Sequence, residues 1–175
     1  TIVHCNTGDE QQESHINKTE GTIQGYMDKK ILNYKDFRHP FFKSALAKVR
    51  DADNILVWGD EDPDGITATA IMLRCLRKTG KNVMYHIPSR KKEGIGLNRK
   101  KLKYFIERRE FDLLITVDCG SVNAEEIQYL NECGKDVIIT DHHIPYKGRY
   151  DSVEIIKSHI LNNESFNHLA GAGVA

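Results

Sequence analysis

Several features that mark membrane, secreted or zinc-binding proteins are missing from this sequence. No apolar run approaches the roughly 20 residues that a membrane-spanning helix needs. The N-terminal residues lack the basic, apolar and small-residue segments of a signal peptide. The four cysteines show no CxxC or zinc-type spacing, so we expect free thiols in a reducing compartment. We therefore predict a cytoplasmic protein without membrane contact.

Net charge is also missing, because Lys plus Arg and Asp plus Glu both number 25. This balance says nothing about partners, so only local charge clusters are informative. The composition is ordinary for a globular protein, and 175 residues are enough for one domain with a substantial core. The chain starts at Thr1 rather than Met, and 169–175 is typical of a glycine turn that opens a helix. We therefore expect a fragment of a longer protein.

Short apolar runs alternate with helical patterns from Asn54 onward. We predict strands over 54–59, 83–87, 112–117 and 136–140, and helices over 65–79, 98–109 and 122–133. Continuously apolar strands that are separated by helices indicate a parallel sheet covered on both faces. The predicted fold class is therefore α/β, a three-layer domain with a mainly parallel sheet and helices on both faces. Residues 1–36 are polar without sustained periodicity, which indicates a partly ordered N-terminal arm.

Acidic residues and histidines follow three of the predicted strands. The first strand is followed by Asp60, Asp62 and Asp64, the third by Asp118, and the fourth by Asp141, His142 and His143. In an open parallel sheet, the residues just past the carboxyl ends of the strands meet at one crevice. Carboxylates and imidazoles directed at one place would repel each other unless cations lay among them. The sequence therefore predicts a metal site.

Each cluster taken alone has an ordinary alternative explanation. The segment from Asp60 to Gly65 also resembles the start of an EF-hand loop, but such a loop needs Glu at its twelfth position, where Ile71 stands. Asp118 is also a candidate helix cap, and an isolated histidine pair is commonly structural. The occurrence of all three clusters at strand ends favours the metal interpretation over these alternatives.

A basic run begins directly after the second predicted strand. Its members are Arg90, Lys91, Lys92, Arg99, Lys100, Lys101 and Lys103. In a parallel sheet this run starts on the same edge as the acidic clusters, where basic side chains can follow a phosphate backbone. The residues from Arg99 to Lys103 equally fit a solvated helix face. We assign substrate binding to Arg90, Lys91 and Lys92, and leave the second group open between the two interpretations.

Five segments carry a family resemblance. Residues 60–67, 117–120 and 140–143 resemble motifs one to three of the DHH phosphoesterase superfamily. The loop 87–98 and the glycine turn 169–175 resemble the corresponding segments of RecJ-type exonucleases. The resemblance runs from about Phe37 to the end, so we expect a DHH-type phosphoesterase domain over 37–175. The family's fourth acidic motif and second lobe have no counterpart here, which implies a domain that is incomplete at its C-terminus.

The resemblance implies a function and roles for the site residues. RecJ-type enzymes remove nucleotides from single-stranded DNA in the 5′-to-3′ direction, in DNA repair and recombination, and use two divalent cations, usually Mn²⁺ and alternatively Mg²⁺. The implied metal ligands are Asp60, Asp62, Asp64, Asp118 and His142, with Asp118 between the two ions. His143 matches the position that approaches the scissile phosphate, and Asp141 matches the acid that supports the histidine pair. Because the fourth carboxylate and the second lobe are missing, this fragment itself is expected to be weak or inactive.

Two other functions on the same fold are open alternatives. One is hydrolysis of short oligonucleotides, cyclic dinucleotides or polyphosphate, and the other is a non-catalytic binding subunit. The loop 87–98 favours the exonuclease over the first, and the intact metal residues argue against the second. Hydrolysis with two ions roughly 3.5–4 Å apart needs no Ser or Cys nucleophile. We therefore predict that Cys119 is a small buried filler.

Overall fold

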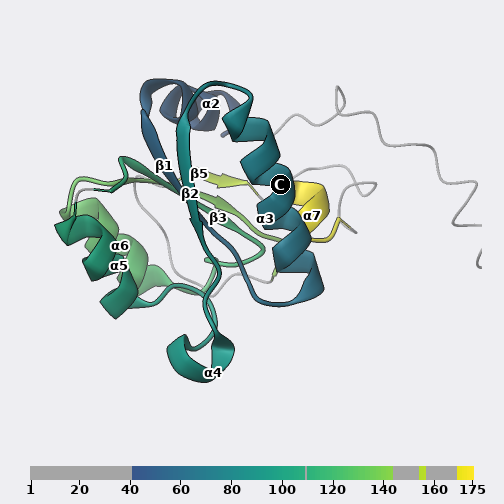
Figure 1. Cartoon of the computed structure of the whole chain (residues 1–175), viewed down its shortest axis with the longest axis vertical. Coiled ribbons are helices and arrows are strands. Elements are labelled where there is room, and N and C mark those ends of the chain that lie inside the picture. The colour runs from purple at the N-terminus through teal and green to yellow at the C-terminus, as the bar shows by residue number, and fades with distance from the viewer. Residues whose placement is uncertain (1–40, 109, 144–153, 157–168) are drawn as a thin grey trace, which may run out of the picture. The chain divides into compact units, whose positions relative to one another are not determined.

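The structure is a computed structural model and describes residues 41–108, 110–143, 154–156 and 169–175 (Figure 1). The predicted arm over 1–36 and its boundary with the following domain lie outside these residues. Within the described ranges, no helix is both long and apolar enough to cross a membrane.

The described strands form one sheet in which every pairing is parallel. They are β1 (Asn54–Trp58), β2 (Asn82–His86), β3 (Leu113–Val117), β4 (Asp136–Thr140) and β5 (Glu154–Ile156). Their order across the sheet is β2-β1-β3-β4-β5, which places β1, β3 and β4 in its interior. The first four strands confirm the predicted strands, with small differences at the ends, whereas β5 was not predicted.

The helices in the described part of the chain are α2 (Phe42–Asp51), α3 (Pro63–Arg77), α4 (Arg90–Glu93), α5 (Arg99–Glu107), α6 (Ala124–Glu132) and α7 (Gly171–Val174). Helices α3, α5 and α6 match the three predicted helices with differences at their ends, whereas α4 lies in the segment 87–98 that was expected to be a loop. Helix α3 begins before the predicted start because Asp62 caps it, with its side chain accepting a hydrogen bond from the Gly65 N–H at 3.0 Å. Pro63 occupies the first helical turn, where its missing N–H is not needed. The acidic segment after β1 therefore also starts the next helix.

The two faces of the sheet pack against different helices. Ile55 and Val57 point into a core that is completed by α2, α3 and α7. Leu56 and Trp58, which alternate with them along β1, belong to a second core with α5 and α6. Figure 1 shows α5 and α6 on the opposite side of the sheet from α3 and α7. All four side chains are fully buried, and burial of such side chains stabilises the fold by about 1.5–3 kcal/mol each. The predicted three-layer α/β fold is confirmed.

The parallel register brings the carboxyl ends of the strands together. Trp58 pairs with His86 on one side and with Thr116 on the other, and Val117 pairs with Thr140. The segments that follow these strands therefore leave the sheet at one edge, where open parallel sheets bind ligands. We call this the carboxyl edge.

Candidate metal centre

Asp118 lies at the centre of the carboxyl edge, directly after β3. Its backbone N–H donates a hydrogen bond to the Thr140 carbonyl at 2.9 Å, which ties the end of β3 to the end of β4. Its φ of 60° is a left-handed conformation that few residues other than glycine adopt. The side chain is 1% exposed, and its Oδ1 accepts no hydrogen bond from the residues that the structure describes. A buried carboxylate oxygen that accepts no hydrogen bond needs a positive partner, so this geometry fits a cation ligand.

Asp118 belongs to two groups of potential metal-ligand atoms. One group contains Asp118, His142 and His143, and the other contains Asp60, Asp62 and Asp118. In each group, the ligand atoms lie within 4.8 Å of one another. A carboxylate shared between two groups can contribute ligand atoms to two neighbouring cations. The structure thus brings together four of the five predicted metal ligands.

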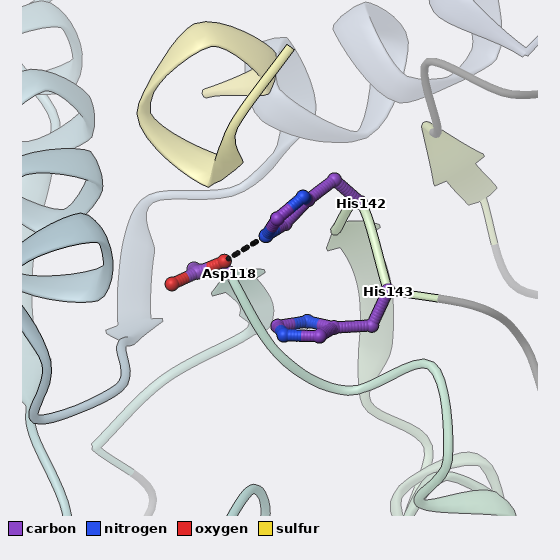
Figure 2. Close-up of side chains that lie close together, drawn as sticks. All are labelled: Asp118, His142 and His143. Carbon is purple, nitrogen blue, oxygen red and sulfur yellow. Dashed lines mark ion pairs between the residues drawn. The ribbon is translucent and has the colours of Figure 1, made fainter. Parts of the chain in front are cut away.

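The histidine pair faces Asp118 from the end of β4 (Figure 2). The Nε2 of His142 lies 3.1 Å from the Oδ1 of Asp118, but not in the alignment of a hydrogen bond. The same nitrogen lies 3.6 Å from the Oδ2 of Asp64. The rings of His142 and His143 are tilted by 49°, with their centroids 4.5 Å apart. His142 is therefore placed to share a cation with Asp118.

Asp64, the fifth predicted ligand, has a different environment. Its Oδ2 accepts a hydrogen bond from the Gly171 N–H at 2.6 Å, and its Oδ1 accepts one from the Ala172 N–H at 2.9 Å. It belongs to neither ligand group found among the described residues. In this structure Asp64 thus fixes the start of α7 against the carboxyl edge, and its role as a ligand stays a prediction.

Gly171 allows α7 to approach Asp118 closely. A Cβ at position 171 would lie 2.5 Å from both the Cβ and the Cγ of Asp118, so no larger residue fits without a shift of the backbone. The sequence predicted a glycine turn over 169–175, and the structure shows that this segment packs on the buried carboxylate. This contact could not be predicted from the sequence, because the glycine pattern does not indicate which part of the fold the turn approaches.

Asp141 anchors the second histidine. Its Oδ1 lies 2.7 Å from the Nδ1 of His143 and accepts a hydrogen bond from the His142 N–H at 2.8 Å. Its Oδ2 accepts hydrogen bonds from the N–H and the hydroxyl of Ser121. Burial acts to raise the pKa of Asp141, but these hydrogen bonds outweigh burial and hold the pKa below its ordinary value. The contacts agree with the predicted supporting role of Asp141 and add Ser121 as a second partner of this carboxylate.

The same contact sets the charge of His143. Burial acts to lower the pKa of His143, but the hydrogen bond and the negative charge of Asp141 raise the pKa above its ordinary value. Asp141 thus shifts the protonation equilibrium of His143 toward the imidazolium form. The His143 side chain is 55% exposed, so it faces the open side of the carboxyl edge.

The electrostatics around Asp118 also favour a cation. Burial, followed by the negative charges of Asp64 and Asp62, raises the pKa of Asp118 to about 7. The carboxyl group alone is therefore partly protonated near neutral pH, whereas a neighbouring cation would favour its ionised form. Carboxylate oxygens combined with an imidazole nitrogen suit divalent cations such as Mn²⁺, so the residues present fit a metal ion.

The predicted substrate-binding residues lie on α4, at the same edge of the sheet. The Nη2 of Arg90 lies 2.6 Å from the Oδ2 of Asp60 and 3.0 Å from the Oδ2 of Asp62. Lys91 and Lys92 are exposed. Arg90 is therefore directed into the acidic group, an ion pair that the sequence analysis did not predict.

The second basic group lies on α5 and contacts other helical side chains. Arg99 lies over the ring of Tyr129, 4.5 Å from its centroid. The Nζ of Lys103 lies 3.6 Å from Glu107, one turn further along the same helix. These contacts favour the solvated helix face over direct contact with a phosphate backbone.

Cys119 is buried beside Asp118. Its Sγ lies 3.7 Å from the carbonyl oxygen of Trp58 and 3.8 Å from that of Gly59. Burial, together with nearby negative charge, raises the pKa of the Cys119 thiol well above its ordinary value. A thiol that stays protonated is a poor nucleophile, which agrees with the predicted role of a buried filler.

Comparison with known protein families gives a match over most of the chain. The model of the DHH family, N-terminal domain, matches residues 54–175. The single-stranded-DNA-specific exonuclease RecJ of Bacillus subtilis is 39% identical over 149 residues, which cover 80% of this chain and 19% of the relative. The enzyme of the same name from Thermus thermophilus is 39% identical over 127 residues, which cover 73% of this chain and 18% of the relative. The chain thus spans about a fifth of the length of these relatives.

Solved structures show the same similarity. A crystal structure of exonuclease RecJ bound to manganese matches with a TM-score of 0.63 and 37% identity, over 75% of this chain and 33% of the other. CDC45 from Entamoeba histolytica matches with a TM-score of 0.53 at 13% identity, over 77% of this chain and 27% of the other. The second match shows a shared fold and no more.

Proposed function

The chain belongs to the DHH family, and we propose that it forms the metal-binding core of a nuclease that hydrolyses phosphodiester bonds in single-stranded DNA. The observation that carries this proposal is the position of Asp118, a buried carboxylate shared by two groups of ligand atoms at the carboxyl edge. The relatives named as single-stranded-DNA-specific exonucleases support the choice of substrate. Removal of nucleotides in the 5′-to-3′ direction, in DNA repair and recombination, is part of the same proposal.

We propose two divalent cations, with Mn²⁺ favoured and Mg²⁺ as the alternative. Asp118 and His142 would hold one cation, and Asp118 with Asp60 and Asp62 would hold the other. Asp64 would join the first set through the oxygen that lies 3.6 Å from His142. The presence of manganese in the structure of a RecJ relative supports the choice of metal.

The protein residues prepare this edge for phosphodiester hydrolysis. When bound, the cations supply an acidified water and neutralise charge that develops on the phosphoryl oxygens. Asp118 is held by its bond to Thr140 and by the packing of α7, so its carboxylate needs no rearrangement to act as a ligand. His143 is oriented through Nδ1 by Asp141, which favours protonation of the ring, and its protonated form can donate a hydrogen bond to a phosphoryl oxygen. No covalent nucleophile is required.

Helix α4 supports a polymeric phosphate substrate. Lys91 and Lys92 are exposed on this short helix, which also places Arg90 beside the acidic group. Exposed lysines contact phosphates through charge alone, without reading sequence. We therefore propose that α4 guides the backbone of the DNA strand toward the cations.

A chimera provides the test, in which this chain replaces the matching segment of the Bacillus subtilis relative. With Mn²⁺, the chimera is expected to release labelled mononucleotides at once from a 5′-labelled single strand, and to shorten a 3′-labelled strand progressively. The same chimera with Asp118→Asn, which keeps the shape of the side chain, is expected to lose this activity. Cleavage of cyclic dinucleotides but not of DNA would assign the small-substrate alternative instead. Equal activity of the Asp118→Asn chimera would contradict the proposal.

A further inference from the structure

The guanidinium of Arg90 spans the two carboxylates at the end of β1. Its Nη2 lies 2.6 Å from the Oδ2 of Asp60 and 3.0 Å from the Oδ2 of Asp62, and its Nε lies 3.3 Å from the Oδ1 of Asp60. This two-pronged contact with Asp60 is the strongest geometry for an arginine and a carboxylate. Asp60 and Asp62 also form one of the two ligand groups around Asp118. The guanidinium therefore occupies the same oxygens that one cation would use.

The backbone around Arg90 is fixed from several directions. The Arg90 N–H donates a hydrogen bond to the Oε2 of Glu61 at 2.9 Å. At the other end of α4, the Oε2 of Glu93 lies 2.8 Å from the Nε2 of His86, the last residue of β2. Beyond α4, the buried indole of Trp58 donates to the Gly96 carbonyl at 3.1 Å. These contacts fix the backbone of α4 in a position from which the Arg90 side chain reaches the acidic group.

The side chain of Arg90 is less constrained than its backbone. It is 39% exposed, whereas the Asp60 side chain that it contacts is 5% exposed. The buried carboxylate of Asp60 needs a positive partner. The partly exposed side chain of Arg90 can instead rotate into solvent. Asp60 can therefore exchange one cationic partner for another while Arg90 moves outward along the open side of the edge.

From this geometry we infer that Arg90 is a tethered counter-cation, which neutralises Asp60 and Asp62 until a divalent cation displaces it. The inference rests on the proposed metal centre and adds an order of loading to it. The position at Asp118 and His142 lies in the other ligand group and accepts its cation first. The position at Asp60 and Asp62 fills only when Arg90 leaves, and the released guanidinium then faces the side from which a phosphate substrate arrives.

Direct binding of Mn²⁺ to the chain tests this order without any assay of activity. Isothermal titration, checked by the electron paramagnetic resonance signal of unbound Mn²⁺, gives the affinity of each position. The wild-type chain is expected to bind one Mn²⁺ tightly and a second weakly. An arginine within about 4–6 Å of an aspartate lowers the pKa of that carboxyl by about 1–3, because the guanidinium opposes binding of a second positive charge. For the same reason, Arg90→Gln is expected to tighten binding of the second Mn²⁺ by about tenfold or more.

The matched control is Arg99→Gln, which removes the same charge from α5. Arg99 lies over the ring of Tyr129 on α6, so its loss is expected to leave both Mn²⁺ affinities at the wild-type values. Arg90→Lys keeps the charge but loses the two-pronged contact, and is expected to tighten the second step to a value between those of wild type and Arg90→Gln. This variant decides the question if Arg90→Gln does not fold.

Thermal unfolding gives an independent result. Without Mn²⁺, Arg90→Gln is expected to unfold at a lower temperature than wild type, because Asp60 has lost its partner. Saturating Mn²⁺ is expected to remove this difference, since the cation replaces the guanidinium. A second-step affinity that is unchanged in both Arg90 variants would overturn the inference. Failure of the wild-type chain to bind any Mn²⁺ would instead overturn the proposed metal centre.

Discussion

The Nε2 of His142 lies 3.1 Å from the Oδ1 of Asp118, although the two residues follow different strands of the sheet. The contact follows from the parallel register, in which Val117 pairs with Thr140 and the Asp118 N–H continues the pairing to the Thr140 carbonyl. Side chains that follow two parallel strands at one edge are thereby brought within ligand distance of a single cation. The predictions below depend on this arrangement.

Asp118→Asn is expected to stabilise the metal-free protein at high pH. In the folded wild type the pKa of this carboxyl is raised from 3.8 to about 7, so its ionisation opposes folding. Wild type therefore loses stability as the pH rises through this window, and the asparagine variant does not. We expect a gain of about 2–4 kcal/mol at high pH. Urea unfolding in EDTA, near pH 3.8 and above pH 7, measures the gain, and an equal gain at both pH values would contradict the assignment.

Gly171→Ala is expected to weaken both the fold and the metal centre. The added Cβ would lie 2.5 Å from the Cβ and Cγ of Asp118, so α7 must move away and its hydrogen bonds to Asp64 must lengthen. We expect a loss of about 1–3 kcal/mol in the free energy of unfolding, typical of overpacking. We also expect Mn²⁺ affinity to fall about tenfold or more, as it does when groups that orient metal ligands are disturbed.

Gly173→Ala serves as the control for this change. Its Cβ would approach Leu169 at 3.0 Å, and this flexible side chain can move aside. The variant carries the same substitution in the same short helix, and is expected to keep the wild-type Mn²⁺ affinity. A similar fall in affinity for both variants would show that α7 acts through its general stability and not through its contact with Asp118.

Asp141→Asn is expected to lower the pKa of His143. Burial, which lowers this pKa, then acts without the opposing hydrogen bond and charge of Asp141. Nuclear magnetic resonance titration of the His143 ring protons measures the change. Ser121→Ala removes one hydrogen bond to Asp141 but keeps its carboxylate, and is expected to shift the pKa of His143 less than Asp141→Asn does.

The same pair gives the wild-type protein a defined pH dependence. The raised pKa of His143 adds stability that is complete below its ordinary value of 6.5 and is lost as the pH rises through the folded value. The lowered pKa of Asp141 adds stability that is complete above 3.8 and is lost as the pH falls through its folded value. The contribution is therefore greatest between these ordinary values. In Asp141→Asn the difference from wild type should shrink on both sides of this window, and a pH-independent difference would contradict the prediction.

Thiol labelling is expected to separate the cysteines of the described region. Cys75 is exposed, whereas Cys119 is buried and its thiol pKa is raised, first by burial. Iodoacetamide should therefore modify Cys75 in the folded protein and spare Cys119 until urea is added. Peptide mass spectrometry reads each site separately. Rapid modification of native Cys119 would reopen a role for its thiolate.

The strands and helices that have a hydrophobic pattern of their own could be predicted from the sequence. Continuously apolar runs located β1, β3 and β4, and their alternation with helices indicated a parallel sheet with two covered faces. Once the strands are parallel, the meeting of Asp118 with His142 follows from topology alone. The strand β5 has only three residues, which is too short for a periodic pattern, and it was missed for that reason.

The parts that escaped prediction depend on contacts between distant segments. Asp60 and Arg90 are 30 residues apart, and the sequence gives no sign that this arginine points into the acidic group and not toward solvent. Asp64 and Gly171 are 107 residues apart, so the three aspartates after β1 look equivalent in sequence. The fold makes them different, because Asp60 and Asp62 are paired with Arg90, whereas Asp64 accepts hydrogen bonds from the backbone of α7.

The central claim is that Asp118 and His142 hold a divalent cation at the carboxyl edge. Crystals of the chain grown with Mn²⁺, with diffraction recorded at the manganese absorption edge, locate the ion by its anomalous signal without any assumption about ligands. The account predicts an anomalous peak within coordination distance of the Asp118 carboxylate and the His142 imidazole. An anomalous peak elsewhere, or the absence of a peak at the carboxyl edge of the sheet at saturating Mn²⁺, would contradict it.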